Sequence, residues 1–280
     1  MKLIHSGKVR EIYEVSEEQL AIVTTDRVSA FDVILPATVK NKGVVLNTIS
    51  NFFFENTKDI IPNHIISSDV NEMPEFFHEE KFKDRTVLVE KLRMLPYEII
   101  VRGYIFGNMW KAYEEGSPFC GIQIKGDYKL AEKLEQPIVT PSTKAETGHD
   151  EYIDIKTMEQ GLGTDLTNKI IEVSLKLYEE CSRYAISRGI IIADTKFEFG
   201  LNKNNELVLA DEIFTPDSSR FWSQADYQVG TSPKSYDKQF IRDWLLNNKV
   251  NGEMQFDSIP QEVIEDTEKI YMECQQKLLK

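Results

Sequence analysis

The sequence predicts an α+β fold with mostly antiparallel sheets, divided into two lobes. Paired runs of alternating apolar residues indicate hairpins, and apolar residues at helical spacing indicate several core-facing helices. Arg93–Pro96 lies between two strand-like runs, and proline disfavours both ladder pairing and a preceding helix. We therefore expect an N-terminal lobe over residues 1–93 and a C-terminal lobe over residues 94–280.

The first lobe is expected to open with a β-hairpin. Val9–Tyr13 and Leu20–Thr24 have strand character, and a short polar turn separates them. Apolar residues recur at helical spacing from Val45 to Phe53, which predicts a helix that ends before Pro62. Thr86–Leu92 returns to strand character and leads into the proline segment.

The second lobe begins with a predicted strand over Glu98–Tyr104 and a short helix over Asn108–Glu115. A long helix is predicted around Ile170–Tyr184, because its apolar residues form one stripe. Helices near 238–248 and 260–279 close the chain. These elements complete the expected α+β pattern.

A polar stretch lies between Pro137 and Tyr152. Because it is rich in hydroxyl and charged side chains, we expect a loop and not a core element. His149 lies here beside an aspartate, but a single histidine is weak evidence for catalysis. Four residues form a donor-rich patch that either meets a substrate or is merely solvated: Thr140, Ser142, Thr143 and Lys144.

The composition is that of an ordinary globular protein, with 41% hydrophobic and 28% charged residues. The net charge of −13 argues against nonspecific binding to nucleic acid or anionic membranes, since both require positive surface potential. An anionic substrate would need a local basic pocket. The three cysteines lack the spacing of a zinc site or a redox dithiol, and Cys181 and Cys274 fall on apolar helix stripes. No signal peptide or membrane span is recognisable, so we expect a cytoplasmic protein.

Three charged residues stand at alternate positions within Ile190–Gly200: Asp194, Lys196 and Glu198. Because strand side chains alternate, these three project from one face and the phenylalanines from the other. Turn residues and a returning strand over Leu207–Ala210 bring Asp211 and Glu212 close by. Such a hairpin resembles a site for a hard cation and phosphate. A solvated face with weak surface ion pairs is the alternative for this motif alone.

Arg220 follows the turn Pro216–Ser219 and precedes two aromatic residues. An arginine at this position suits bidentate capture of a phosphate or carboxylate. Stacking of Arg220 on Trp222 by a cation–π contact is the structural alternative.

Three further motifs suggest anion or nucleotide contacts, each with an ordinary structural alternative. Gly7 and Lys8 precede the first hairpin and could approach a polyphosphate, although the motif is not a Walker A loop. An apolar slot beside polar anchors is suggested by Glu90, Lys91, Leu92 and Met94. Arg102 ends a strand and Asn108 begins a helix, where an anion is favoured.

Taken together, these segments resemble the SAICAR synthetase family of purine biosynthesis, from Ser6–Tyr13 to Asp237–Trp244. The most specific match is the acidic strand Ile192–Gly200. Thr215–Trp222 matches the following element, and Thr140–Glu146 matches a loop of the longer, yeast-like branch. One position departs from the family pattern, because Asn108 stands where a serine is usual, although its amide can still donate a hydrogen bond.

The resemblance implies a two-lobed fold with a nucleotide cleft between the lobes, and ATP-dependent ligation of L-aspartate to carboxyaminoimidazole ribonucleotide (CAIR). SAICAR, ADP and phosphate would be formed through an acyl phosphate, without a covalent enzyme nucleophile. Mg²⁺ would be held by Glu198 and Asp211, and Lys196 and Asp194 would be catalytic. The expected ATP contacts are Gly7, Lys8, Glu90, Lys91, Leu92, Met94, Glu198 and Asp211. The expected substrate contacts are Arg102, Asn108, Thr143, Lys144, Ser219 and Arg220.

Two other functions stay compatible with the motifs. A small-molecule kinase would also use a cleft with Mg²⁺ carboxylates, but it would release a stable phosphorylated acceptor. A regulatory nucleotide-binding module would keep the cleft and show no turnover. Neither the oligomeric state nor the full aspartate pocket follows from the sequence.

Overall fold

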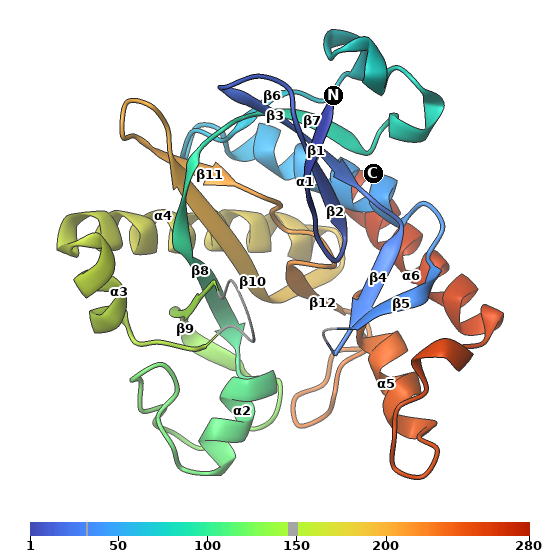
Figure 1. Cartoon of the computed structure of the whole chain (residues 1–280). Helices are drawn as coiled ribbons and strands as arrows, with labels where there is room; N and C mark the ends of the chain where they lie inside the picture. The colour runs from blue at the N-terminus through green and yellow to red at the C-terminus, as the bar shows by residue number, and fades with distance from the viewer. Residues whose placement is uncertain (32, 145–150) are drawn as a thin grey trace.

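Two antiparallel sheets organise the chain (Figure 1). The computed structural model describes residues 1–31, 33–144 and 151–280. One sheet has the strand order β1-β2-β3-β7-β6, and the other has the order β11-β10-β8-β9 with β12 paired to β10. Every pairing between these strands is antiparallel, which confirms the α+β class with antiparallel sheets. His149 lies outside the described residues.

The first sheet contains the predicted opening hairpin. Its strands are β1 (Lys2–Ser6), β2 (Arg10–Glu14), β3 (Gln19–Thr24), β6 (Ile65–Ser67) and β7 (Thr86–Glu90). β2 pairs with β3, which confirms the hairpin. A separate two-stranded ribbon is formed by β4 (Arg27–Ala30) and β5 (Val33–Thr38).

The second sheet is built around one long central strand. Its strands are β8 (Arg93–Tyr104), β9 (Lys133–Thr143), β10 (Ile190–Leu201), β11 (Leu207–Ala210) and β12 (Ser219–Ser223). β10 pairs with β8 from Asp194 to Leu201, and it pairs with β12 and β11 at its two ends. The predicted acidic hairpin is therefore present as β10 and β11.

The predicted helices are confirmed with small shifts of their ends. They are α1 (Lys42–Thr57), α2 (Gly107–Glu114), α4 (Thr164–Ser187), α5 (Gln239–Asn247) and α6 (Gln261–Leu279). A further helix, α3 (Ile155–Leu162), was not predicted. Short 3-10 turns cover Val70–Glu72, Glu75–Phe77, Glu80–Phe82 and Phe256–Ser258. None of the helices in the described part of the chain is long and apolar enough to cross a membrane.

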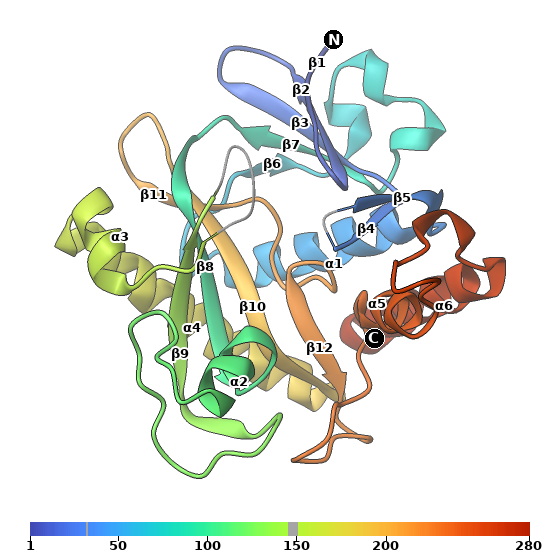
Figure 2. The same cartoon turned by 60° about the horizontal axis from the view of Figure 1, so that its bottom comes forward.

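The main core lies between the second sheet and helices α1 and α4, and α4 runs along one face of β10 (Figure 2). Phe197 and Phe199 of β10 are 0% and 1% exposed and belong to this core, as the alternation of the strand predicts. Cys181 and Cys274 are buried and free, which agrees with buried reduced thiols. The opposite face of β10 is left for the charged side chains.

The β4–β5 ribbon and the C-terminal helices share a smaller core. Val28 and Leu35 pack with Ile241, Leu245 and Val263 in this cluster. Helix α1 also contacts helix α6. The segment after β3 is thus packed against the end of the chain, whereas the first sheet contains only strands from residues 2–90.

The polar stretch after Pro137 was predicted to be a loop, and for residues 137–143 this is wrong. These residues belong to β9 and pair with β8 from Tyr97↔Thr143 to Arg102↔Ile138. Their hydroxyls are buried because partners satisfy them: Thr140 Oγ1 accepts from Arg102 Nε at 2.9 Å. A buried hydroxyl with a charged partner is tolerated in a core, and composition alone does not reveal the partner.

Strand β8 also begins earlier than expected, at Arg93 instead of Glu98. Pro96 is accommodated where the pairing with β10 shifts between Glu198↔Glu98 and Gly200↔Met94. A shifted register leaves a residue outside the ladder, and this is a position that proline can occupy within a sheet.

Candidate active site

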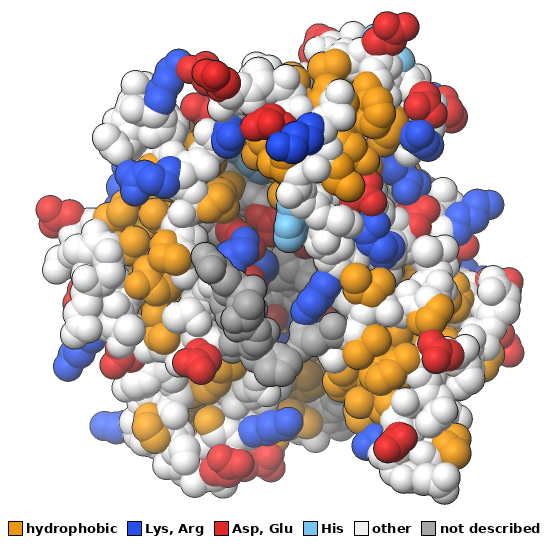
Figure 3. All heavy atoms as spheres, viewed as in Figure 1, with side chains coloured by type: hydrophobic (Ala, Val, Ile, Leu, Met, Phe, Trp, Pro, Cys, Tyr) orange, Lys and Arg blue, Asp and Glu red, His pale blue; other side chains and the backbone are white. Residues whose placement is uncertain are grey.

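The charged row of β10 lies on the face of the second sheet that points away from α4. Asp194 and Glu198 are 9% and 2% exposed, so this row is a buried cluster and not the solvated face that was the alternative. Figure 3 shows acidic and basic side chains together in a hollow at the centre of this view. Thr195 Oγ1 lies 2.8 Å from Ser219 Oγ and ties β10 to β12.

Lys196 is the centre of this cluster. Its Nζ lies 2.7 Å from Glu198 Oε1, 2.8 Å from Glu98 Oε1 and 3.7 Å from Asp211 Oδ2. Burial by itself would lower the pKa of Lys196, but the surrounding carboxylates outweigh it and raise the pKa well above its ordinary value. Lys196 is therefore a fixed positive charge and not a general base.

Asp211 follows β11 and has a left-handed backbone with φ of 59°. Aspartate tolerates this conformation better than most residues, and here it directs the carboxylate toward Lys196. Burial would raise the pKa of Asp211, but Arg10 and Lys196 hold it well below its ordinary range. Asp211 therefore stays ionised, as a cation ligand must be.

Arg10 of β2 joins the first sheet to this hairpin. Its guanidinium lies 3.5 Å from Asp211 Oδ1 and 2.5 Å from Glu212 Oε2. Glu212 also accepts a hydrogen bond from the Thr215 hydroxyl at 2.5 Å. Of the acidic pair Asp211 and Glu212, only Asp211 also lies within ion-pair distance of Lys196 in the described structure.

Asp194 is shared by two arginines from opposite neighbours of β10. Arg102 of β8 reaches Asp194 Oδ2 at 3.2 Å, and Arg220 of β12 pairs with the same oxygen. The Arg220 guanidinium lies 4.9 Å from the centre of the Phe106 ring, so Arg220 stacks on Phe106 and not on Trp222, the ring named in the structural alternative. Both arginines thus line one basic wall and share the carboxylate of Asp194.

Arg102 is only 4% exposed and is therefore a buried arginine. Its terminal nitrogen lies 3.4 Å from the Tyr152 hydroxyl. Asn108 Nδ2 donates to the same hydroxyl at 3.3 Å, and Asn108 lies inside α2, whose N-cap is Phe106. The side chains of Asn108 and Arg102 therefore converge through Tyr152.

A cavity of about 560 Å³ opens over this basic wall. It includes Arg102, Asn108, Asp194, Lys196 and Arg220, five of the residues predicted from the sequence. Several lining residues were missed by the sequence analysis: Phe31, Lys111, Gln239, Arg242 and Leu246. Ser219 lines an adjoining cavity of about 150 Å³ that shares Asp194, Arg220 and Arg242 with the larger one.

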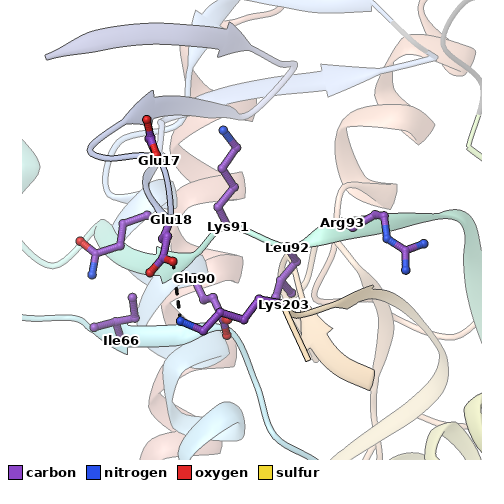
Figure 4. A pocket seen from close by; sticks show the side chains of 9 residues that line it. Glu17, Glu18, Ile66, Glu90, Lys91, Leu92, Arg93 and Lys203 are labelled. Atoms are coloured by element: carbon purple, nitrogen blue, oxygen red, sulfur yellow. Dashed lines mark ion pairs between the residues drawn. The ribbon is translucent and has the colours of Figure 1, made fainter. Parts of the chain in front are cut away.

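A second cavity, of about 520 Å³, lies where the two sheets meet (Figure 4). It includes the predicted residues Glu90, Lys91 and Leu92 on the connection between β7 and β8. The other lining residues are Glu17, Glu18, Gln19, Ile66, Arg93 and Lys203. In Figure 4 the Arg93 side chain extends away from the other labelled side chains.

The remaining predicted residues lie around these two cavities. Met94 is 42% exposed and is not among the residues that line the second cavity. Gly7 and Lys8 lie in the turn between β1 and β2, where the Gly7 N–H donates to Arg10 O at 2.8 Å. Thr143 ends β9 and accepts from the Glu151 N–H at 3.2 Å. Lys144 follows it and pairs with Glu198 across the site.

Glu98, Arg10 and Arg242 contact or line the site but were not singled out from the sequence. Glu98 shares a β8 face with Arg102 by the alternation of the strand, and that signal was available. The sequence around Arg10 and Arg242 shows no comparable pattern that would have linked these residues to the site. No group of three or more His, Cys, Asp or Glu side chains that could hold a metal ion occurs among the described residues.

Known proteins resemble this chain over nearly its whole length. A family model described as SAICAR synthetase matches residues 3–259. The phosphoribosylaminoimidazole-succinocarboxamide synthase of Lachnospira eligens is 49% identical over 281 residues, covering 98% of this chain and 93% of that protein. The protein of the same name from Saccharomyces cerevisiae is 43% identical over 289 residues, covering 99% and 94%.

Solved structures give the same result. The SAICAR synthase of Saccharomyces cerevisiae complexed with SAICAR superposes with a TM-score of 0.89 at 41% identity, covering 99% of this chain and 94% of that chain. A SAICAR synthetase in complex with ADP superposes with a TM-score of 0.72 at 26% identity, covering 98% and 97%.

Proposed function

The chain belongs to the SAICAR synthetase family, and from this premise we propose that it joins L-aspartate to the carboxylate of CAIR in a reaction driven by ATP. It is a carbon–nitrogen ligase of purine biosynthesis, so the ligase is favoured over the kinase and the regulatory module. The observation that carries the substrate assignment is the row Asp194, Lys196 and Glu198, which presents carboxylates and a fixed ammonium group beside a basic cavity.

We place ATP in the cavity at the junction of the two sheets. A relative in this family is described in complex with ADP, and here Leu92 offers an apolar surface beside the charged Glu90 and Lys91. The exposed side chain of Met94 is a further candidate contact for the base. The phosphates would then point toward Gly7 and Lys8, where glycine permits close approach of the chain. Within this proposal, residues 1–93 form the lobe that supplies these contacts, and residues 94–280 form the other.

Glu198 and Asp211 fit a magnesium ion that accompanies the nucleotide. Both carboxylates lie at one ammonium group, and the charges around Asp211 keep it ionised. Mg²⁺ commonly uses one or two carboxylates and completes its shell with substrate phosphates and water, so two protein ligands suffice. Such an ion would neutralise the phosphate oxygens during transfer.

We place CAIR in the larger cavity, with its phosphate at the basic wall. A relative is described as complexed with SAICAR, the product of this reaction. Arg102 and Arg220 supply forked donors, and Ser219 and Asn108 add a hydroxyl and an amide. Because Asp194 neutralises only part of the charge of the two arginines, a phosphate dianion is still attracted there.

The reaction proceeds in two steps. A carboxylate oxygen of CAIR attacks the γ-phosphorus of ATP, the bond to the bridging oxygen breaks, and ADP leaves. The aspartate amine then attacks the carbon of the acyl phosphate, the new carbon–nitrogen bond forms, and orthophosphate leaves. The amine loses its proton to solvent or to the departing phosphate. No enzyme nucleophile is required.

Lys196 and Asp194 have separate tasks in this scheme. The Lys196 ammonium stays protonated because its pKa is raised, so it stabilises negative charge on the transferred phosphoryl group. Asp194 pairs with Arg102 and Arg220 and would accept a hydrogen bond from the amine on the imidazole ring of CAIR. Lys196 therefore acts through its positive charge, and Asp194 orients the substrate.

L-Aspartate is assigned to the region of Thr143 and Lys144 at the end of β9. Both side chains offer donors to a carboxylate, and Lys144 already reaches the edge of the site through Glu198. A cation bound at Glu198 competes with the Lys144 ammonium for the same carboxylate. Lys144 would then be released toward the incoming aspartate.

The decisive test is ADP release with ATP, CAIR and L-aspartate omitted in turn. We expect ADP and SAICAR in equal amounts with all three substrates, and no orthophosphate without L-aspartate. A stable phosphorylated product in the absence of L-aspartate would instead establish a kinase. Two matched variants complete the test: Glu198→Gln lies in the site, and Glu206→Gln lies at an exposed position of the same hairpin. Activity lost only in Glu198→Gln is due to the site and not to the removal of a negative charge in general.

A further inference from the structure

A buried lysine outside the residues described above meets the turn that precedes Arg220. Lys42 lies in the first turn of α1 and is 0% exposed. Its Nζ donates to Asp217 Oδ2 at 2.7 Å, across 175 positions of the sequence. The Asp217 side chain is itself only 3% exposed.

Asp217 is held from two further elements. Lys238 Nζ, at the start of α5, lies 3.0 Å from the same Oδ2 atom. The Tyr271 hydroxyl of α6 donates to Oδ1 at 2.7 Å. Donors from α1, α5 and α6 thus converge on one carboxylate.

Such a cluster is not explained by stability. Burying an ammonium group is costly, and a buried ion pair rarely stabilises a fold more than an apolar replacement would. Burial lowers the pKa of Lys42 to about 8, although Asp217 opposes this effect. The cluster is therefore better explained by the position of Asp217 in the fold or by the charges around it.

The position of Asp217 supplies that reason. It directly precedes Ser218, Ser219 and Arg220, and its backbone N–H donates to Thr215 Oγ1 at 3.2 Å. Asp217 and Lys238 line the cavity of about 150 Å³ that also contains Ser219 and Arg220. The carboxylate thus fixes the turn that presents the donors of the phosphate site.

The charge balance gives a second argument. A carboxylate beside a phosphate site would repel a phosphate dianion unless it were neutralised. The cavity beside this turn is lined by three carboxylates (Asp194, Asp217 and Asp237) and three cations (Arg220, Lys238 and Arg242), so the buried Lys42 ammonium adds one positive charge to a balanced set. The excess positive charge lies next to Ser219 and Arg220 and favours an anion there.

We propose that Lys42 is a positioning residue for binding of the ribonucleotide phosphate, which acts by holding and neutralising Asp217. This role rests on the proposed function, because it assumes that the phosphate of CAIR lies at Ser219 and Arg220. Lys42 does not touch the substrate. Its effect should therefore appear in the Michaelis constant for CAIR and not in the handling of ATP.

The principal test is Lys42→Met in the full-length protein, with Lys58→Met as the control. Lys58 follows the same helix but its side chain is 57% exposed. We expect the KM for CAIR to rise about tenfold in Lys42→Met, with the KM for ATP unchanged within about twofold. Lys58→Met should match the wild type. Equal rises for CAIR and ATP would mean a general structural effect and overturn the proposal.

A milder variant keeps the test decisive if Lys42→Met does not fold. Tyr271→Phe keeps the buried ring and removes only the hydroxyl that donates to Asp217. We expect a rise of roughly threefold in the KM for CAIR alone. An unchanged constant in this folded variant would refute a role of the Asp217 cluster in positioning.

The same assays distinguish this inference from the proposed function. If the wild type releases no ADP with CAIR, ATP and L-aspartate, the proposed function fails, and with it the basis of the inference. If the wild type is active but Lys42→Met and Tyr271→Phe keep its KM for CAIR, only the inference fails. In Asp217→Asn, adding Lys42→Met should raise this constant less than in the wild type, because both residues act through one contact.

Discussion

Lys144 and Glu198 form an ion pair although 54 positions separate them. Lys144 is exposed and directly follows β9, whereas Glu198 is 2% exposed in the middle of β10. The ammonium group occupies the carboxylate that we propose as a magnesium ligand. Nucleotide binding and release of Lys144 are therefore expected to be linked, since one carboxylate is shared between them.

Lys144→Ala is expected to raise the KM for L-aspartate about tenfold, because an ammonium group that would meet an aspartate carboxylate is lost. The KM for ATP should stay unchanged or fall slightly, since a competing cation leaves Glu198. Initial rates with each substrate varied in turn measure both constants. Lys169→Ala, on the exposed surface of α4, is the control. An effect confined to ATP would show that Lys144 does not serve L-aspartate.

Glu198→Gln and Asp211→Asn are expected to fold normally and to lose about a hundredfold or more in kcat, because each removes a charge from the metal and phosphate assembly. The measurement is kcat at saturating Mg²⁺ and ATP, with circular dichroism to verify folding. Glu206→Gln changes an exposed carboxylate on the same hairpin and should keep full activity. Near-normal turnover of Glu198→Gln or Asp211→Asn would remove that residue from the proposed metal site.

Arg220→Ala should weaken binding of CAIR far more than binding of ATP. Truncating one partner of a desolvated charge pair typically costs about 2 to 5 kcal/mol, and Arg220 lines the CAIR cavity but not the proposed ATP cavity. Calorimetric titration with each ligand checks this. Arg188→Ala is a useful control, because Arg188 is exposed and stacks on Tyr184 at 5.2 Å. Lost ATP affinity with unchanged CAIR affinity would assign Arg220 to the nucleotide.

The central strand of the site was predictable because one physical rule determines it. Side chains alternate along a strand, so Phe197 and Phe199 had to face the core once Asp194, Lys196 and Glu198 faced the opposite side. The apolar and the charged positions predict the same orientation of the strand toward the core. The direction of the charged face followed from this pattern.

Other parts depended on partners that sequence patterns do not show. Thr140 is fully buried in β9 because Arg102 satisfies its hydroxyl, and Lys42 is fully buried because Asp217 receives its ammonium group. Burial of a polar side chain is favourable only with its partner in place, and the tertiary fold brings the partners together. A composition rich in hydroxyl and charged residues therefore led to the wrong prediction of a loop for residues 137–143.

His64 links the first sheet to the acidic hairpin and gives a prediction for acid stability. It is 4% exposed, its N–H donates to Leu209 O at 3.0 Å, and its carbonyl accepts from the Glu90 N–H at 2.8 Å. Its ring lies 5.5 Å from that of Phe54, and its Nε2 has no hydrogen-bond partner among the described residues. Burial lowers the pKa of His64 from 6.5 to about 4, outweighing the opposing charge of Asp211.

Because the folded protein holds His64 neutral, the unfolded chain binds this proton first as the pH falls below 6.5. The contribution of His64 to the free energy of unfolding is therefore full above pH 6.5 and is lost progressively toward pH 4, by at most about 3 kcal/mol. His64→Phe keeps a buried ring without the titration. Urea denaturation between about pH 7 and pH 4 should show wild-type stability falling more steeply than that of His64→Phe, while His5→Gln, at an exposed position, follows the wild type. Parallel profiles for wild type and His64→Phe would show that His64 does not contribute to acid sensitivity.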